Sequence, residues 1–147
     1  MPKESRNYQD DDALIQQIYV TMRLFTKTLN DAIKPYDIYS SEWTIMNYLS
    51  KHEDISQSDI ASALQIEPAA VSKTLGKMEK KGLVMKSSKQ DKREKYIALT
   101  DKGLELLPLV SKSVLEHRNK ALGELSEKNR GNMRQLMLKV LNNLKEI

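Results

Sequence analysis

Residues 56–103 restrict the possible folds of this chain more than any other stretch. Ser56, followed three residues later by Asp59, has the spacing of a capping box, so a helix is expected to begin there. Pro68 suits the first turn of a second helix because its missing N–H is not needed, and Gly82 suits that helix's C-terminal end. Two predicted strands follow. Helix, turn, helix and hairpin in this order predict a winged helix-turn-helix.

The second of these helices, over about 68–81, has two contrasting faces. At 100° per residue, Val71, Leu75 and Met78 fall within about 60° of one another and are expected to be buried. On the opposite face, small side chains would let the backbone approach a polyanion, and cations would surround it. Gly76 costs roughly 1 kcal/mol relative to alanine, which a close approach or neutral drift explains equally well. The outward face carries Ala69, Ala70, Ser72, Lys73, Gly76, Lys77 and Lys80.

The predicted hairpin has strands at about 83–87 and 94–99 and a basic tip between them. Alternation of apolar and polar residues in the second strand predicts that Ile97 and Leu99 face inward. Asp91 and Arg93 are two residues apart, so both can lie on one side of the strand. The carboxylate can then hold the guanidinium in one orientation.

Positive charge is concentrated in the same region. Residues 67–95 contain nine lysines and arginines against four acidic residues, a local charge of +5. Since the whole chain carries +4, the remainder sums to −1. A local excess of this kind is expected where a surface faces phosphates. A solvated lysine-rich face is the commoner explanation of such charge taken by itself.

Apolar seams predict long helices on both sides of the central unit, over 10–33, 101–122 and 126–147. The first would be roughly 35 Å long at 1.5 Å per residue, longer than the small central unit can cover. Part of the seams is therefore expected to contact another chain. Pro108 is expected to kink the middle helix. The first seam consists of Ile15, Ile18, Met22, Phe25, Leu29 and Ala32, and the last of Met133, Met137, Val140, Leu144 and Ile147.

A connector at 34–40 leads into a further helix over about 41–51. Ser40 or Ser41 is the expected N-cap of this helix. The polar turn at 52–54 contains three potential metal ligands, but adjacent residues seldom converge on one ion, so a solvated turn is favoured. Residues expected in the core are Trp43, Ile45, Met46 and Leu49, together with Met22, Met78, Met133 and Met137.

Several classes of protein are disfavoured by composition. The chain has no cysteine, so disulfides and thiolate metal sites are excluded. Its first residues are polar, and no apolar run approaches the length of a membrane span, so we expect a cytoplasmic protein without membrane association. Two distant histidines and no glycine-rich phosphate loop leave no catalytic constellation. We therefore expect neither an enzyme nor a bound cofactor.

The segments described above resemble the MarR family of bacterial transcription regulators over nearly the whole chain. The most specific match is DKREKYIALTDKG at 91–103, which is similar to the family's pattern D-x-R-x-x-x-h-x-L-T-x-x-G, where h is apolar. Tyr39 stands where a capping threonine is frequent, and Asp37 where a glycine is frequent. Further matches are SQSDIASAL at 56–64, MEKKGLV at 78–84, PYDIYSSEW at 35–43 and GELSE at 123–127.

The resemblance implies a mainly α fold with a small β-hairpin wing, in which long terminal helices form a homodimer. A single domain is expected over 9–147, with the helix-turn-helix at 56–81, the wing at 83–99 and dimerisation helices at 10–33, 101–122 and 126–147. It further implies a regulator that binds a pseudo-palindromic operator in double-stranded DNA. Members commonly repress transcription and release DNA when a small, often aromatic or lipophilic, effector binds.

Candidate site residues follow from the faces and from the resemblance. The helix over 68–81 would enter a major groove, and Arg93, supported by Asp91, would lie in or beside the adjacent minor groove. Expected DNA contacts are Ser56, Gln57, Ser58, Ala69, Ala70, Ser72, Lys73, Lys77, Lys86, Lys89, Lys92 and Arg93. A possible effector crevice involves Tyr36, Tyr39, Trp43 and His117, although aromatic residues at helical spacing are more often plain core.

One rival interpretation stays open: a winged helix that serves as a protein-interaction module without specific DNA readout. The sequence does not decide between repression and activation, nor does it disclose the operator or an effector.

Overall fold

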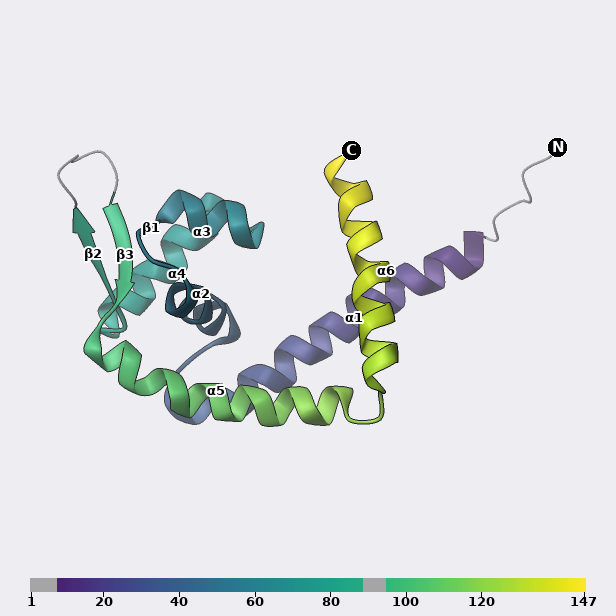
Figure 1. The fold of residues 1–147 in the computed structure, drawn as a ribbon, viewed down its shortest axis with the longest axis horizontal. Coiled ribbons are helices and arrows are strands. Elements are labelled where there is room, and N and C mark those ends of the chain that lie inside the picture. Colours follow the sequence, from purple (N-terminus) through teal and green to yellow (C-terminus); the bar gives the residue numbers. More distant parts are fainter. Residues whose placement is uncertain (1–7, 89–94) are drawn as a thin grey trace. The chain divides into compact units, whose positions relative to one another are not determined.

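The computed structural model describes residues 8–88 and 95–147 of the chain. Figure 1 shows three long helices and, between the first two of them in the chain, a group of short helices and strands. In chain order the elements are α1 (Tyr8–Ile33), η1 (Lys34–Tyr36), α2 (Ser40–Lys51), β1 (Ile55–Ser56), α3 (Gln57–Leu64), α4 (Pro68–Lys80), β2 (Val84–Ser88), β3 (Lys95–Leu99), α5 (Asp101–Leu122) and α6 (Glu127–Lys145). The predicted fold class, mainly α with a small β wing, is confirmed.

The chain divides after Val114 into two compact units. The first contains α1 to β3 and the first part of α5, and the second contains the end of α5 and all of α6. The expectation of one MarR-type domain over 9–147 stays a prediction.

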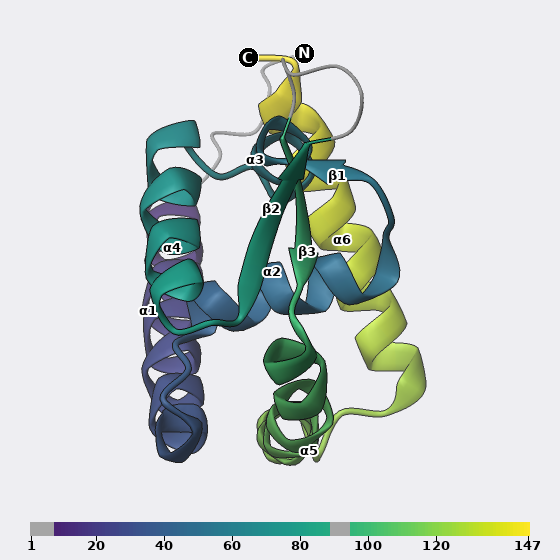
Figure 2. The same ribbon diagram turned by 90° about the vertical axis from the view of Figure 1, so that its left-hand side faces the viewer.

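The sheet has three antiparallel strands in the order β1-β3-β2, so β3 is central (Figure 2). Val84 pairs with Leu99 and Lys86 with Ile97 across the hairpin. On the other side of β3, Ile55 pairs with Ile97, and both side chains are buried. The sequence indicates only the two hairpin strands, because a strand of two residues has no periodicity of its own. Strand β1 is recognised only by its pairing with β3.

The hydrophobic core is formed by the short helices, the sheet, the end of α1 and the first part of α5. Val71, Leu75 and Met78 of α4 are fully buried, as the predicted helical face requires. Ile97 and Leu99 of β3 are also buried, as predicted from their alternation. From α2 the core receives Trp43, Ile45, Met46 and Leu49, and this prediction is confirmed.

Three methionines expected in the core are not there. Met22 of α1 is 54% exposed, and Met133 and Met137 of α6 are 50% and 48% exposed. Their seams have the expected periodicity, but these side chains are exposed among the described residues of the single chain. Periodicity shows which face of a helix is apolar, and it does not show what covers that face.

The helix ends follow the capping chemistry at most sites. Ser56 accepts a hydrogen bond from Asp59 N and donates its own N–H to the Asp59 carboxylate, which confirms the capping box. Gly82, with φ of 74°, follows α4, and Leu83 N donates to Met78 O at 2.9 Å. Ser126 caps α6 through Asn129 N. Helix α5 runs from Asp101 to Leu122 without interruption at Pro108.

The predicted N-cap of α2 is wrong. Tyr39 occupies that position, and Ser40 is already the first helical residue. The carboxylate of Glu42, the third helical residue, accepts the N–H of Tyr39 at 2.9 Å, which is the bond back to the N-cap backbone found in a capping box. Ser40 N instead donates to Asn30 Oδ1 at 2.7 Å, a contact with α1 that only the folded chain provides.

Asp59 is expected to make stability depend on pH. The hydrogen bond from the Ser56 N–H, followed by that of its side chain, lowers the pKa of Asp59 below its ordinary value. A carboxyl with a lower pKa in the folded state stabilises the fold above its unfolded pKa, and this stabilisation is lost as pH falls through the folded pKa. Asp59→Asn should therefore lower the melting temperature at neutral pH and converge with the wild type as pH falls through the folded pKa of Asp59. Melting curves across pH 7 to 2.5 test this, and parallel profiles would contradict it.

Candidate nucleic-acid interface

Helix α4 presents an exposed face of small and basic side chains opposite its buried stripe. Its first turn carries alanines and a serine, whereas Lys77 and Lys80 lie in its last turn. Gly76 lies between these two regions, and a Cβ added there would meet no atom within 4 Å. Packing therefore does not require glycine at this position. The predicted contacts on this face, all exposed, are Ala69, Ala70, Ser72, Lys73 and Lys77.

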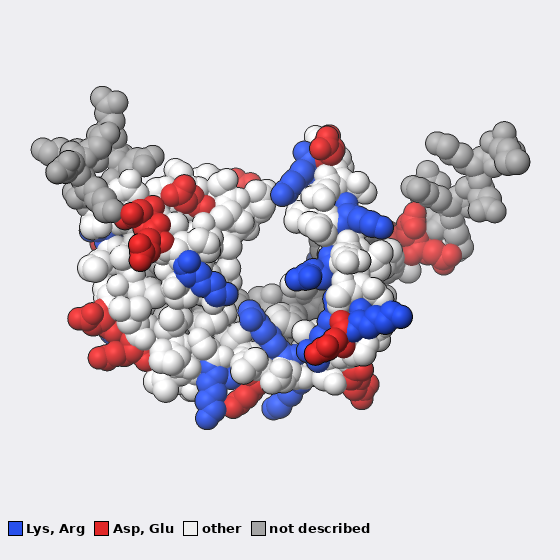
Figure 3. All heavy atoms as spheres, in the orientation of Figure 1, with Lys and Arg blue, Asp and Glu red and all other residues white. Residues whose placement is uncertain are grey.

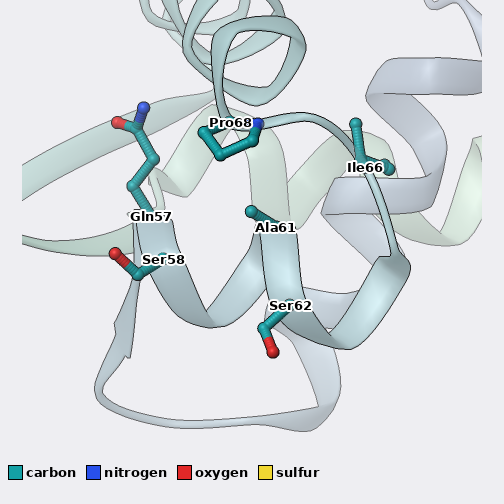
Figure 4. A pocket seen from close by; sticks show the side chains of 6 residues that line it. All are labelled: Gln57, Ser58, Ala61, Ser62, Ile66 and Pro68. Atoms are coloured by element: carbon teal, nitrogen blue, oxygen red, sulfur yellow. The ribbon is translucent and has the colours of Figure 1, made fainter. Parts of the chain in front are cut away.

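An open hollow of about 430 Å³ lies beside this face, between α3 and the start of α4 (Figure 4). Gln57 and Ser58 project into its rim from the first turn of α3, and Pro68 borders it from α4. Both helix N-termini carry backbone N–H groups that lack partners within their helices, which favours negative charge nearby. Other lining residues are Ala61, Ser62 and Ile66.

Four residues around this hollow, Ala61, Ser62, Ile66 and Pro68, are absent from the predicted contacts. Ser62 follows Ser58 by one helical turn, so a search for polar residues on the same face of α3 would have identified it. Ile66 and Pro68 border the hollow only because of the way α3 and α4 meet, and helical periodicity does not carry that information.

Lys86 on β2, a predicted phosphate contact, has a local partner. Its Nζ lies 3.7 Å from a carboxylate oxygen of Glu79 on α4. A partly exposed pair of this kind contributes only about 0–1 kcal/mol, so a phosphate can compete with the carboxylate for the ammonium group. Lys89, Asp91, Lys92 and Arg93 lie outside the described residues, and their roles stay predictions from the sequence.

The residues of the predicted effector crevice have different environments. Tyr36 is half-buried, and its phenolic oxygen accepts a hydrogen bond from Ser113 Oγ at 3.3 Å. Tyr39 is 57% exposed, whereas Trp43 is only 5% exposed and belongs to the core. His117 belongs to the second unit, whereas the other three residues belong to the first. The crevice stays a prediction.

Comparison with known proteins gives a consistent result. The sequence model of the MarR family matches residues 38–95, which include α2, the helix-turn-helix and the first residue of β3. The HTH-type transcriptional regulator YwoH of Bacillus subtilis is 28% identical over 117 residues, which cover 80% of this chain and 85% of that protein. This chain belongs to the MarR family.

Solved structures of MarR-family proteins have the same fold over nearly the whole chain. A MarR/EmrR family transcriptional regulator from Acinetobacter sp. ADP1 has a TM-score of 0.83 at 29% identity, covering 94% of this chain and 98% of that one. Staphylococcus aureus MepR in complex with DNA has a TM-score of 0.77 at 26% identity, covering 89% and 94%. Among the described helices of this MarR-family chain, none is long and apolar enough to cross a membrane.

Proposed function

We propose that this protein is a homodimeric transcription regulator that represses its target genes by binding a pseudo-palindromic operator. A small aromatic or lipophilic molecule would relieve this repression, as is typical of the MarR family. The observation that carries the proposal is the outward face of α4, where small residues and lysines are exposed opposite a fully buried stripe. The resolved MepR–DNA complex supports the same use of the fold.

Each part of the face has a proposed task. Helix α4 enters a major groove, where Lys73 and Lys77 contact base edges or nearby phosphates, and the small residues allow close approach. The start of α3, with Gln57 and Ser58, contacts phosphates and sets the register without reading the sequence. Ser56 was also predicted as a contact, but it is 7% exposed and its hydroxyl and N–H pair with Asp59, so its role is to cap α3. Residues proposed from the sequence alone are Lys89, Lys92 and Arg93, the last oriented by Asp91.

The apolar surface of the single chain supports the dimer. Large hydrophobic side chains are exposed on α1, α5 and α6, and they recur at helical spacing. Exposed apolar side chains on one face of a helix mark an interaction site, and we propose that a second copy covers those of α1, α5 and α6. Two recognition helices would then bind half-sites about one turn of DNA apart, roughly 34–36 Å. Basic side chains also stand along α6 in the view of Figure 3.

The test of this function is selection of bound fragments from the organism's own DNA, followed by titration of the selected duplex at several salt concentrations. A DNA reader that neutralises several phosphates loses affinity steeply as salt rises, with a slope of about −0.9 per phosphate contact. A protein-interaction module would enrich no fragment and would show weak binding without a preferred duplex. Because a bacterial repressor binds DNA in the cytoplasm, we also propose that this protein is cytoplasmic and that it has no catalytic activity.

Gly76→Ala is expected to separate stability from DNA binding. Alanine is the better helix former and its Cβ meets no atom within 4 Å, so the free energy of unfolding should rise by about 1 kcal/mol. The same methyl group would project toward the DNA and weaken operator binding by about tenfold, since an added methyl in a close contact costs roughly 1–3 kcal/mol. Urea denaturation and fluorescence anisotropy measure the two effects.

Gly131→Ala is the matched control for this substitution. Gly131 also has open space at its Cβ position, and it lies in α6, outside the proposed DNA-binding face. It should gain similar stability with unchanged operator affinity. If Gly76→Ala binds the operator as tightly as the wild type, the proposed approach of α4 to DNA at this position is wrong.

A further inference from the structure

A buried charged pair connects α2 to the end of the recognition helix α4. Glu42, in the first turn of α2, is only 1% exposed. Its Oε1 accepts hydrogen bonds from Tyr39 N and from Lys81 Nζ, the latter at 2.8 Å. Its Oε2 is buried without a hydrogen-bond partner. A carboxylate in such a place depends on its counter-charge, because removing one member of a buried pair leaves an uncompensated charge.

The ammonium group of Lys81 has further contacts on the connector between α1 and α2. It donates to the carbonyl oxygen of Asp37 at 2.7 Å and lies 5.1 Å from the centre of the Tyr39 ring. Asp37 has a φ of 55°, the left-handed conformation that ends η1. Since Lys81 is the C-cap of α4, this one side chain joins the end of α4 to the segment that leaves α1.

The backbone at the same point is held by the start of α5. The carbonyl oxygen of Lys81 accepts a hydrogen bond from Lys102 Nζ at 2.7 Å. The next carbonyl, of Gly82, accepts one from the Thr100 hydroxyl. Thr100 Oγ1 also accepts from Gly103 N at 3.1 Å and so caps α5. The C-terminal end of α4 is therefore held from two sides, by the segment after α1 and by the first turn of α5.

We propose that Lys81 is a positioning residue that sets the direction of α4 relative to α1 and α5. In the proposed dimer, α1 and α5 carry the apolar surface that meets the second copy, so the direction of α4 determines the separation of the two recognition helices. A rearrangement of the Asp37–Tyr39 connector would reach α4 through the same ammonium group. This inference rests on the proposed function, and it assigns to Lys81 a task in reading half-site spacing without contact with DNA.

The test uses the double variant Glu42→Gln/Lys81→Met in the full-length protein. Glutamine keeps an acceptor for Tyr39 N, methionine keeps much of the lysine stem, and the net charge is unchanged. No unpaired buried charge remains, so the variant should fold and dimerise. We expect operator affinity to fall by about tenfold, or about 1.4 kcal/mol, because residues that couple two sites typically have effects of this size. We also expect the preference for the natural operator over one with a single inserted base pair to shrink.

The spacing preference is the decisive measurement, since a loss of general stability lowers affinity for both duplexes alike. Lys81→Arg, which keeps the charge, should keep most of the preference. If the double variant fails to fold, Lys102→Met serves instead: it removes only the exposed donor to Lys81 O and should reduce the preference to a smaller extent. A folded variant with wild-type affinity and spacing preference would overturn the positioning role. A wild type that binds no selected duplex would overturn the proposed function itself.

Discussion

Gly103→Ala is expected to lower the free energy of unfolding by about 3 kcal/mol, because overpacking against a rigid neighbour costs roughly 1–3 kcal/mol and sometimes more. A Cβ on Gly103 would lie far inside van der Waals contact with the carbonyl oxygen of Leu83, and 3.3 Å from Leu99 Cδ2. The carbonyl oxygen of Leu83 is a backbone atom that accepts a hydrogen bond from Thr100 N at 3.0 Å. It cannot move without breaking this hydrogen bond between the segment after α4 and the start of α5. The glycine ends the pattern that runs from Asp91 to Gly103, and its role is the close packing of α5.

Thermal and urea denaturation at matched protein concentration measure this loss. For a chain of this length, 3 kcal/mol corresponds to a fall in melting temperature of roughly 10 °C. Gly131→Ala provides the comparison, since the same substitution at an open position should raise the melting temperature. If Gly103→Ala has the same melting temperature as the wild type, α5 can shift away from Leu83 at little cost in free energy.

Val140→Glu is expected to convert the dimer into a monomer and to weaken operator binding by about 10²–10⁴-fold, the usual loss when two linked sites become independent. Val140 belongs to the α6 seam and is 41% exposed in the single chain, so the fold of one subunit loses little packing. A carboxylate buried between two apolar seams would be costly to desolvate. Light scattering coupled to size exclusion measures the mass, and anisotropy measures the affinity.

Asn142→Glu is the matched control, because it adds the same charge two residues further along α6. Position 142 points to the opposite side of the helix from Val140 at 100° per residue. This variant should stay dimeric and bind the operator. If Val140→Glu stays dimeric as well, the α6 seam is not the surface that joins the two copies.

The proposed DNA-binding face was largely predictable from the sequence. Helical periodicity separates Val71, Leu75 and Met78 from the outward side chains of α4, and burial in the structure follows that division. The hollow near Ser62 and Ile66 was not predicted, because it depends on how two helices meet. The Lys81 contacts were not predicted either. Lys81 and Glu42 are 39 residues apart, and each is an ordinary charged residue within its own segment.

The sequence by itself determined the helices, most of their caps, the hairpin strands and the apolar faces. These depend on chemistry within a few residues, such as the Ser56 and Asp59 capping box, or on a repeat of 3.6 or 2 residues. Only the tertiary structure decided that Ile55 adds a third strand, that Tyr39 precedes α2, that Met22 and Met137 stay uncovered in one chain, and that Gly103 must have no side chain. Each of these features depends on whether segments that are distant in the sequence come into contact. Local sequence patterns do not contain that information.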